Sequence, residues 1–296
     1  MKFSSRFLLF LITVLLISTS SVRSQSNQTE AAIFNIGIGT IFSGIGAVIN
    51  KEPQEKFGKV LVKGMAQGAL GGYLVYESKV IAGRISNQKN LTYGWPAKFM
   101  NSAGTSIIEN AASNRNFWEQ WNLNIGFNRI EFHTKDRFQL KYRIQPVSFL
   151  LTAYTAVQNK FEPELSLRVG EFVFSGNNTF GYEDNNDYYL GRAISTAILL
   201  NPEAGGFNYN TVTHELIHVF QYHDFNVLNA YTIKPLEEFK KGSGFFRKMD
   251  KIFHYDFNIF VFAGLYKMEH FGKDQKSFEG YYSNYFEREA YLFSNY

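Results

Sequence analysis

The chain has 296 residues, no cysteine, a formal net charge of +4 and a high aromatic content of 17%. Without cysteine it forms no disulfides and carries no lipid anchor on cysteine, so its stability must come from an apolar core or a bound metal. The mild and scattered positive charge argues against a nucleic-acid-binding protein, and the low charged fraction of 19% argues against disorder.

Residues 1–24 have the order of features expected of a secretory signal peptide. They begin with Lys2 and Arg6, continue with an apolar run over 7–17 and end in a serine-rich stretch. The apolar run is short for a membrane span, so cleavage is expected and an uncleaved anchor is the alternative. We therefore expect a secreted or extracytoplasmic protein, located in the periplasm or cell envelope.

Residues 25–93 contain two apolar, glycine-rich runs, 32–49 and 60–81, separated by a polar segment. The second run has Gly64, Gly68 and Gly72 at four-residue spacing, which leaves a flat helix face for close approach of another helix. The sequence thus predicts a glycine-rich helical hairpin. The first run would rise about 27 Å as a helix, which reaches across a bilayer core. Membrane contact through residues 32–81, burial in a soluble protein and a removable propeptide all remain open.

Residues 94–296 are expected to form one domain of the α+β class. A helical pattern covers 106–112, and we expect Trp118 and Trp121 to anchor it to the core. Alternating apolar and polar residues then predict half-buried strands of an antiparallel sheet. These strands are expected over 129–134, 139–144, 165–174 and 192–200.

Two clusters of charge interrupt this domain. Glu183, Asp184 and Asp187 have the residue types of a calcium site but not the spacing of an EF-hand, so we interpret them as a solvated loop. A small basic cluster over 240–251 is interpreted as a solvated loop or helix end. From residue 236 onward the sequence predicts mostly helices with aromatic faces.

The most informative motif is His214-Glu215-Leu216-Ile217-His218, which reads H-E-x-x-H. We expect it on a helix that is capped by Asn210 or Thr211 and runs to about Phe225. Positions i and i+4 share one helix face, so the two imidazoles can bind one metal ion, with zinc as the expected cofactor. Glu215 is then placed to act as general base toward a metal-activated water.

A catalytic zinc site needs a third protein ligand, and the segment Asn284–Tyr291 offers one. With its Glu287 and Ala290, this segment resembles the E-x-x-A segment that follows H-E-x-x-H in gluzincin metallopeptidases. The resemblance implies that Glu287 is the third ligand and that Ala290 allows close helix packing. Glu289 is a competitor because it directly precedes Ala290.

The resemblance departs from the family pattern at one position. An aspartate that orients a ligand histidine often lies four residues after the ligand, where this chain has Tyr291 or Phe293. Another residue must then orient the imidazole.

A second alternative for the third ligand is Asp224, six residues after His218, where metzincin-type sequences place theirs. That pattern requires a glycine at the position of Gln221, and the chain has none there. His223 is interpreted as a histidine at the helix end.

The gluzincin resemblance implies a zincin-like active-site helix and a secreted zinc metallopeptidase that hydrolyses peptide bonds of a peptide or protein substrate. The oxyanion donor is open among four side chains, which are Tyr222, His254, His270 and Tyr291. Two other classes also remain open: a membrane-associated envelope protein anchored or oligomerised by the hairpin, and a non-catalytic binding protein. A structural metal site has no use for Glu215, which argues against the last class.

Overall fold

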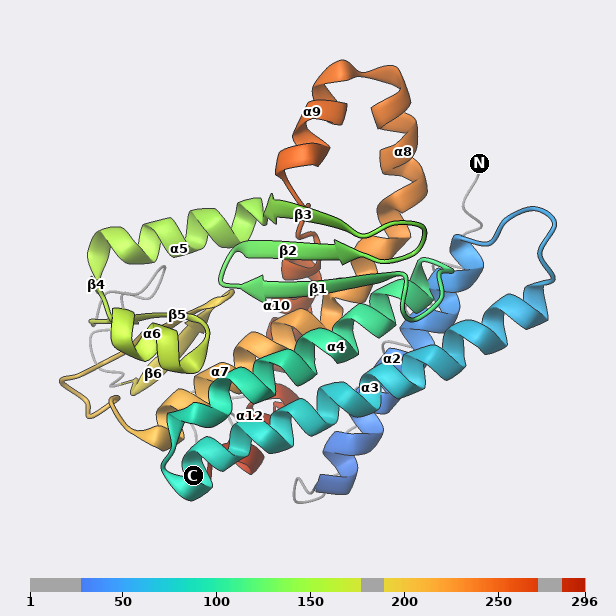
Figure 1. Cartoon of the computed structure of the whole chain (residues 1–296). Helices are drawn as coiled ribbons and strands as arrows, with labels where there is room; N and C mark the ends of the chain where they lie inside the picture. Colours follow the sequence, from blue (N-terminus) through green and yellow to red (C-terminus); the bar gives the residue numbers. More distant parts are fainter. Residues whose placement is uncertain (1–27, 177–188, 271–283, 296) are drawn as a thin grey trace.

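A computed structural model describes residues 28–176, 189–270 and 284–295 of the chain. The chain is α+β, as predicted (Figure 1). The segment expected to be a signal peptide and the acidic loop residues Glu183, Asp184 and Asp187 lie outside the described residues.

The predicted glycine-rich hairpin is present as α2 (Gln28–Ile49) and α3 (Phe57–Gln88). Their backbones touch where glycines face each other. A Cβ atom added to Gly72 would lie 2.8 Å from Ile36 Cα, and one added to Gly64 would lie 2.7 Å from Ala47 Cβ. Side chains there would push the helices apart, which is the physical reason for glycine at these positions.

Within the described residues, α2 is the one helix that is long and apolar enough to cross a membrane, judged by length and composition alone. Of the 18-residue stretch that meets this test, 39% is buried inside the protein. Its inner face packs on α3 and on α4 (Gly94–Ala112), which follows a short 3-10 turn, η1 (Leu91–Tyr93).

The first sheet is antiparallel and lies across α4 (Figure 1). Its strands are β1 (Gln120–Ile125), β2 (Asn128–His133) and β3 (Gln139–Ile144), in the order β1-β2-β3. The predicted strands at 129–134 and 139–144 are confirmed, whereas β1 was not predicted. The prediction that Trp118 anchors the core was wrong. Trp118 lies two residues before β1, and its side chain is 48% exposed.

The segment 165–174 is not one strand, as the alternation suggested. Its first part belongs to helix α6 (Pro163–Val169), and only Phe172–Ser175 forms a strand, β5. Pro163 is suited to the first helical turn, and Gly170 ends the helix with a left-handed φ of 81°. Pro163 and Gly170 therefore favour a short helix here, although residues 165–169 alternate between apolar and polar side chains as a strand would. Helix α5 (Pro146–Gln158), which was not predicted, and the short strand β4 (Lys160–Phe161) precede α6.

The segment 192–200 is likewise not one strand but a hairpin of β6 (Gly191–Ile194) and β7 (Ala197–Leu200). Ser195, with a φ of 57°, makes the turn. The second sheet has the order β4-β5-β7-β6 and is mixed, because β5 and β7 are parallel. The expectation of a purely antiparallel sheet was therefore wrong for this part of the chain.

Helix α7 (Tyr209–Asp224) carries the H-E-x-x-H motif and is buried from Thr211 to its end. It is packed between α3, α12 (Tyr285–Ser294) and the hairpin β6–β7. The cap is not Asn210 or Thr211 but Asn208, whose side chain accepts from Thr211 N at 2.8 Å. After a 3-10 segment, η2 (Phe225–Thr232), come α8 (Ile233–Gly242), α9 (Gly244–Ile252) and α10 (Asn258–His270).

The close contact of α2 and α3 makes a testable prediction about two glycines in the hairpin. Gly72→Ala should lower the free energy of unfolding by about 1–3 kcal/mol, because the new methyl group meets the α2 backbone. Gly37→Ala is the matched control, since a Cβ there has no neighbour within 4 Å. It should raise stability by about 0.5–1 kcal/mol through helix propensity. Urea unfolding of both variants checks this, and equal effects would show that the helices are not in backbone contact.

Candidate metal centre

Three predicted ligands meet at the junction of α7 and α12. His214, His218 and Glu287 each offer one ligand atom, and these atoms lie within 4.8 Å of one another. The two imidazole Nε2 atoms are 3.1 Å apart, and Glu287 Oε2 lies 3.3 Å from that of His214 and 3.5 Å from that of His218. Two ligands of a tetrahedral zinc ion are separated by about 3.3 Å, given metal–ligand distances near 2.0–2.1 Å. The observed spacing therefore fits a single zinc ion.

The hydrogen bonding of Glu287 also fits a metal ligand. Its Oε1 accepts from the Tyr266 hydroxyl, whereas its Oε2, facing both imidazoles, is buried and accepts no hydrogen bond of normal geometry. A buried carboxylate oxygen without a donor is costly unless a cation completes it. Burial would raise the pKa of Glu287, but the adjacent imidazoles hold it well below its usual range. The carboxylate is thus ready to bind a cation.

Gln221 fixes the orientation of His218. The Gln221 amide donates to Phe286 O at 2.8 Å and to Glu289 Oε2 at 2.9 Å, so its oxygen is left to face the imidazole. His218 Nδ1 therefore donates to Gln221 Oε1 at 2.8 Å, and the Nε2 lone pair of a neutral ring points at the ligand cluster. Gln221 thus takes the orienting role for which the sequence offered no aspartate, and Ser294 Oγ lies 3.5 Å from His214 Nδ1.

The pKa of His218 depends on the neighbouring carboxylate of Glu287. Burial alone would lower the pKa of His218, but the Glu287 carboxylate beside it raises it to about 9. A bound metal ion and this proton compete for the same lone pair.

Glu215 lies on the same helix, beside strand β6. Its carboxylate accepts from the Ala193 N–H, and burial raises its pKa. Gly191 makes this proximity feasible, since a Cβ there would be 2.9 Å from Glu215 Cγ. Burial with a raised pKa is the environment in which a carboxyl group acts as a proton acceptor near neutral pH.

The two competing acidic residues are placed elsewhere. Asp224 and Glu289 both bind the ammonium group of Lys79, at 2.6 and 2.8 Å, in a cluster where all three side chains are buried. Glu289 also accepts from Asn35 Nδ2 at 2.6 Å. Their carboxylates are therefore engaged in holding α2, α3, α7 and α12 together, and neither shares the ligand cluster of His214 and His218.

The oxyanion candidates separate in the same way. The Tyr291 ring packs against that of His214, with centroids 4.6 Å apart. Tyr222 lies away from the cluster, with its hydroxyl 3.1 Å from Ser148 Oγ, and His254 Nδ1 lies 3.9 Å from Glu131. The side chain of His270 is outside the described part of the structure. Sequence reasoning missed Tyr266, which no motif marks.

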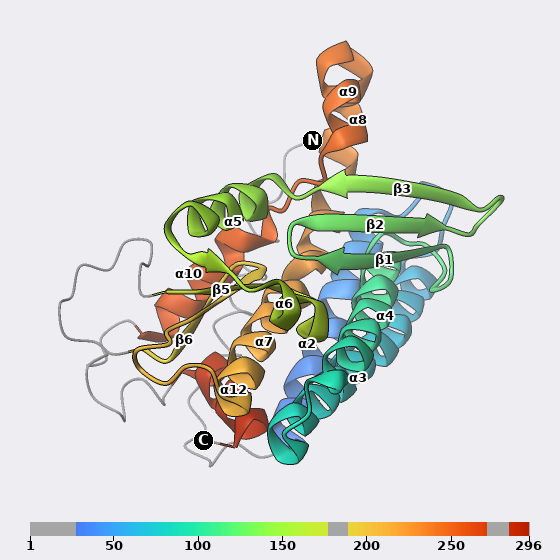
Figure 2. The same cartoon turned by 60° about the vertical axis from the view of Figure 1, so that its left-hand side comes forward.

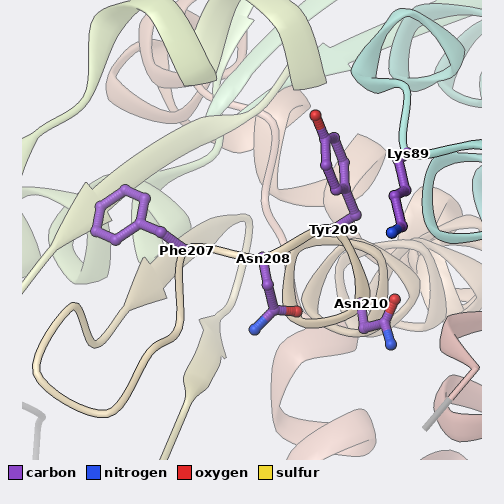
Figure 3. A pocket seen from close by; sticks show the side chains of 5 residues that line it. All are labelled: Lys89, Phe207, Asn208, Tyr209 and Asn210. Atoms are coloured by element: carbon purple, nitrogen blue, oxygen red, sulfur yellow. The ribbon is translucent and has the colours of Figure 1, made fainter.

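The cluster is narrowly exposed. The side chains of His214 and His218 retain only 7% and 10% exposure, so a peptide backbone could reach them only if the site widened. A hollow of about 530 Å³ lies at the first turn of α7 and is lined by Lys89, Phe207, Asn208, Tyr209 and Asn210 (Figure 3). None of the three ligands lines it.

Comparisons with family models, with curated protein sequences and with solved structures find no match to this chain.

Asp224 gives a prediction about pH. Burial and the Glu289 carboxylate raise its pKa from 3.8 to about 6, although Lys79 opposes the shift. Because the folded state holds the proton more tightly than the unfolded state, Asp224 costs stability as the pH rises through this interval. The difference in unfolding free energy between Asp224→Asn and the wild type should therefore shift by about 2 kcal/mol in favour of the variant as the pH rises from 4 to 7. Urea unfolding across this range measures the shift.

The exposed Asp136→Asn serves as the control and should leave the slope against pH unchanged. A constant difference between Asp224→Asn and the wild type across the range would mean that the pKa of Asp224 is the same in the folded and unfolded states, contrary to its burial beside Glu289.

Proposed function

We propose that the protein is a zinc-dependent metallopeptidase of the gluzincin type, secreted by way of its N-terminal segment. The observation that carries this proposal is the convergence of His214, His218 and Glu287 at distances that suit one zinc ion, with Glu215 on the same helix. A structural zinc site is normally closed by a fourth protein ligand, whereas a catalytic site has three and an open position. Among the described residues, this cluster has three.

The roles of the four side chains follow from their positions. A zinc ion held by His214, His218 and Glu287 would polarise a substrate carbonyl and make a nearby water more acidic. Glu215 would accept the proton of that water and return it to the leaving amine. Its hydrogen bond from the Ala193 N–H fixes the carboxylate for this transfer.

Strand β6 supplies a means of aligning a peptide. Within the described residues it pairs only with β7, and on its other edge the Ala193 N–H is bonded to Glu215, so an extended chain would pair with the remaining main-chain groups of that edge. Main-chain pairing along such an edge positions a peptide with little dependence on its side chains. Tyr291, packed on His214, is the proposed donor to the carbonyl oxygen of the reacting bond.

The first prediction of this proposal concerns zinc content. The purified protein should hold one zinc ion per chain, and His214→Ala, His218→Ala and Glu287→Gln should each abolish stoichiometric binding. Gln221→Ala should weaken zinc binding by about 10- to 100-fold, because His218 loses the partner that orients it. Elemental analysis and a competing chelator measure both effects.

Glu289→Gln is the matched control for Glu287→Gln, since both glutamates are buried on α12. It should still bind one zinc ion per chain, though more weakly than the wild type because Glu289 supports Gln221, and Asp224→Asn should also bind one zinc ion. Zinc retained by Glu287→Gln but lost by Glu289→Gln would show that the third ligand is Glu289 and not Glu287. A folded wild-type protein that binds no zinc would overturn the proposal.

The second prediction concerns activity. Glu215→Gln should keep its zinc and lower the rate of peptide hydrolysis by about 100-fold or more, because the amide cannot accept the proton. Hydrolysis of a casein or peptide-library substrate, followed by mass spectrometry, measures the rate. Equal activity in Glu215→Gln and the wild type would exclude this residue as the base.

A further inference from the structure

Helices α8 and α9 form a tower that projects from the body of the protein, away from the sheets and the packed helices (Figures 1 and 2). Neither helix contains a buried residue. With 10 and 9 residues, they are also shorter than the roughly 12–15 residues at which isolated helices become stable in water. The tower therefore depends on contacts between its own two helices.

A few specific contacts join the two helices to each other and to the body of the protein. The rings of Phe239 and Phe246 lie 5.7 Å apart across the two helices. Lys240 Nζ lies 3.3 Å from Asp250, and Arg247 donates to Lys240 O at 2.8 Å, which satisfies the carboxyl end of α8. At the base, His254 N donates to Ile144 O at 2.9 Å, which ties the tower to β3.

Large apolar side chains are exposed near the tip. The turn Gly242-Ser243-Gly244 is followed directly by Phe245, which is 64% exposed, and Phe246, which is 38% exposed. Phe239, in the last turn of α8, is 58% exposed. Scattered exposed apolar residues are ordinary, but a group of them on a projecting element marks an interaction surface.

The same element holds most of the net charge of the protein. Residues 233–252 contain six basic and three acidic side chains, a net +3, whereas the whole chain has +4. The acids are occupied: Glu237 pairs with Lys240, and Glu238 with Lys241 at 2.7 Å. Within the described residues, Lys248 and Lys251 have no carboxylate partner and remain available to an external anion.

We propose that the tip of the α8–α9 tower docks on an anionic lipid surface, with Phe245 entering the interface and Lys248 and Lys251 facing lipid phosphates. Projection from the body, exposed rings beside a glycine turn and unpaired cations are together what an interfacial helix element requires. This inference is independent of the proposed zinc chemistry, since Glu215→Gln should leave lipid binding unchanged.

The test is co-sedimentation of the full chain with vesicles of phosphatidylcholine alone and of phosphatidylcholine with phosphatidylglycerol. The wild type should bind the second kind and not the first. Phe245→Ser and the double variant Lys248→Glu, Lys251→Glu should each lose binding. Each basic side chain near an anionic surface is worth about fivefold in partitioning, so the double charge reversal should weaken binding by at least 25-fold. The Phe245→Trp variant should show a blue-shifted emission when anionic vesicles are added.

Phe57→Ser is the matched control, because Phe57 is 58% exposed at the start of α3, outside the tower. It should bind vesicles like the wild type, and circular dichroism should show all variants folded. The proposal would be overturned if the wild type bound neither kind of vesicle, or bound both equally. It would also be overturned if Phe57→Ser lost binding while the tower variants kept it, or if the double lysine variant lost binding while Phe245→Ser kept it. The last result would indicate binding by charge alone, without entry of the ring into the interface. Concentration-dependent association without vesicles would also overturn the proposal and would indicate a second copy of the chain.

Discussion

The ammonium group of Lys79 connects the helices on which the rest of the structure depends. It lies on α3, fully buried, and binds Asp224 at the end of α7, Glu289 on α12 and the side-chain oxygen of Asn35 on α2. Removing one member of a buried ionic cluster leaves an uncompensated charge and costs about 3–5 kcal/mol. The four helices are therefore coupled through one point, and the relative placement of α7 and α12 is set there.

The positions of the three candidate ligands depend on this ionic cluster around Lys79. Glu289 and Glu287 are two residues apart on α12, so fixing one carboxylate fixes the stretch of helix that presents the other. Gln221 bridges the two groups, because it donates to Glu289 Oε2 and accepts from His218. Precise placement of the three candidate ligands requires support from the residues behind them, and the buried ionic network around Lys79 supplies that support.

Local patterns predicted much of this arrangement, and the errors have physical causes. The period of the motif helix and the four-residue glycine spacing concern neighbours on a single helix, where spacing alone determines direction. The choice of Glu287 over Glu289 as candidate ligand came from the gluzincin resemblance, and in the structure Glu287 is the one of the two that lies beside His214 and His218. Alternation failed over 165–174 because Pro163 and Gly170 define a short helix there. It missed the turn at Ser195, a non-glycine residue with a left-handed φ. The partners of Lys79 and the bond from Tyr266 to Glu287 join residues distant in sequence, and no local pattern encodes them.

The same contacts bear on whether residues 25–93 are a removable segment. Ala31, Ala82 and Ile85 lie in one apolar core with Leu216, Val219 and Ala290. Leu216 lies within the motif on α7, Val219 directly follows it, and Ala290 lies three residues after Glu287 on α12. A propeptide normally covers a finished domain, whereas this hairpin supplies part of the interior of the domain. Its excision would expose that core and leave Asp224 and Glu289 buried without their cation. The hairpin is therefore best understood as an integral part of the fold. A mature protein that lacked it would have to be assembled on a different set of contacts.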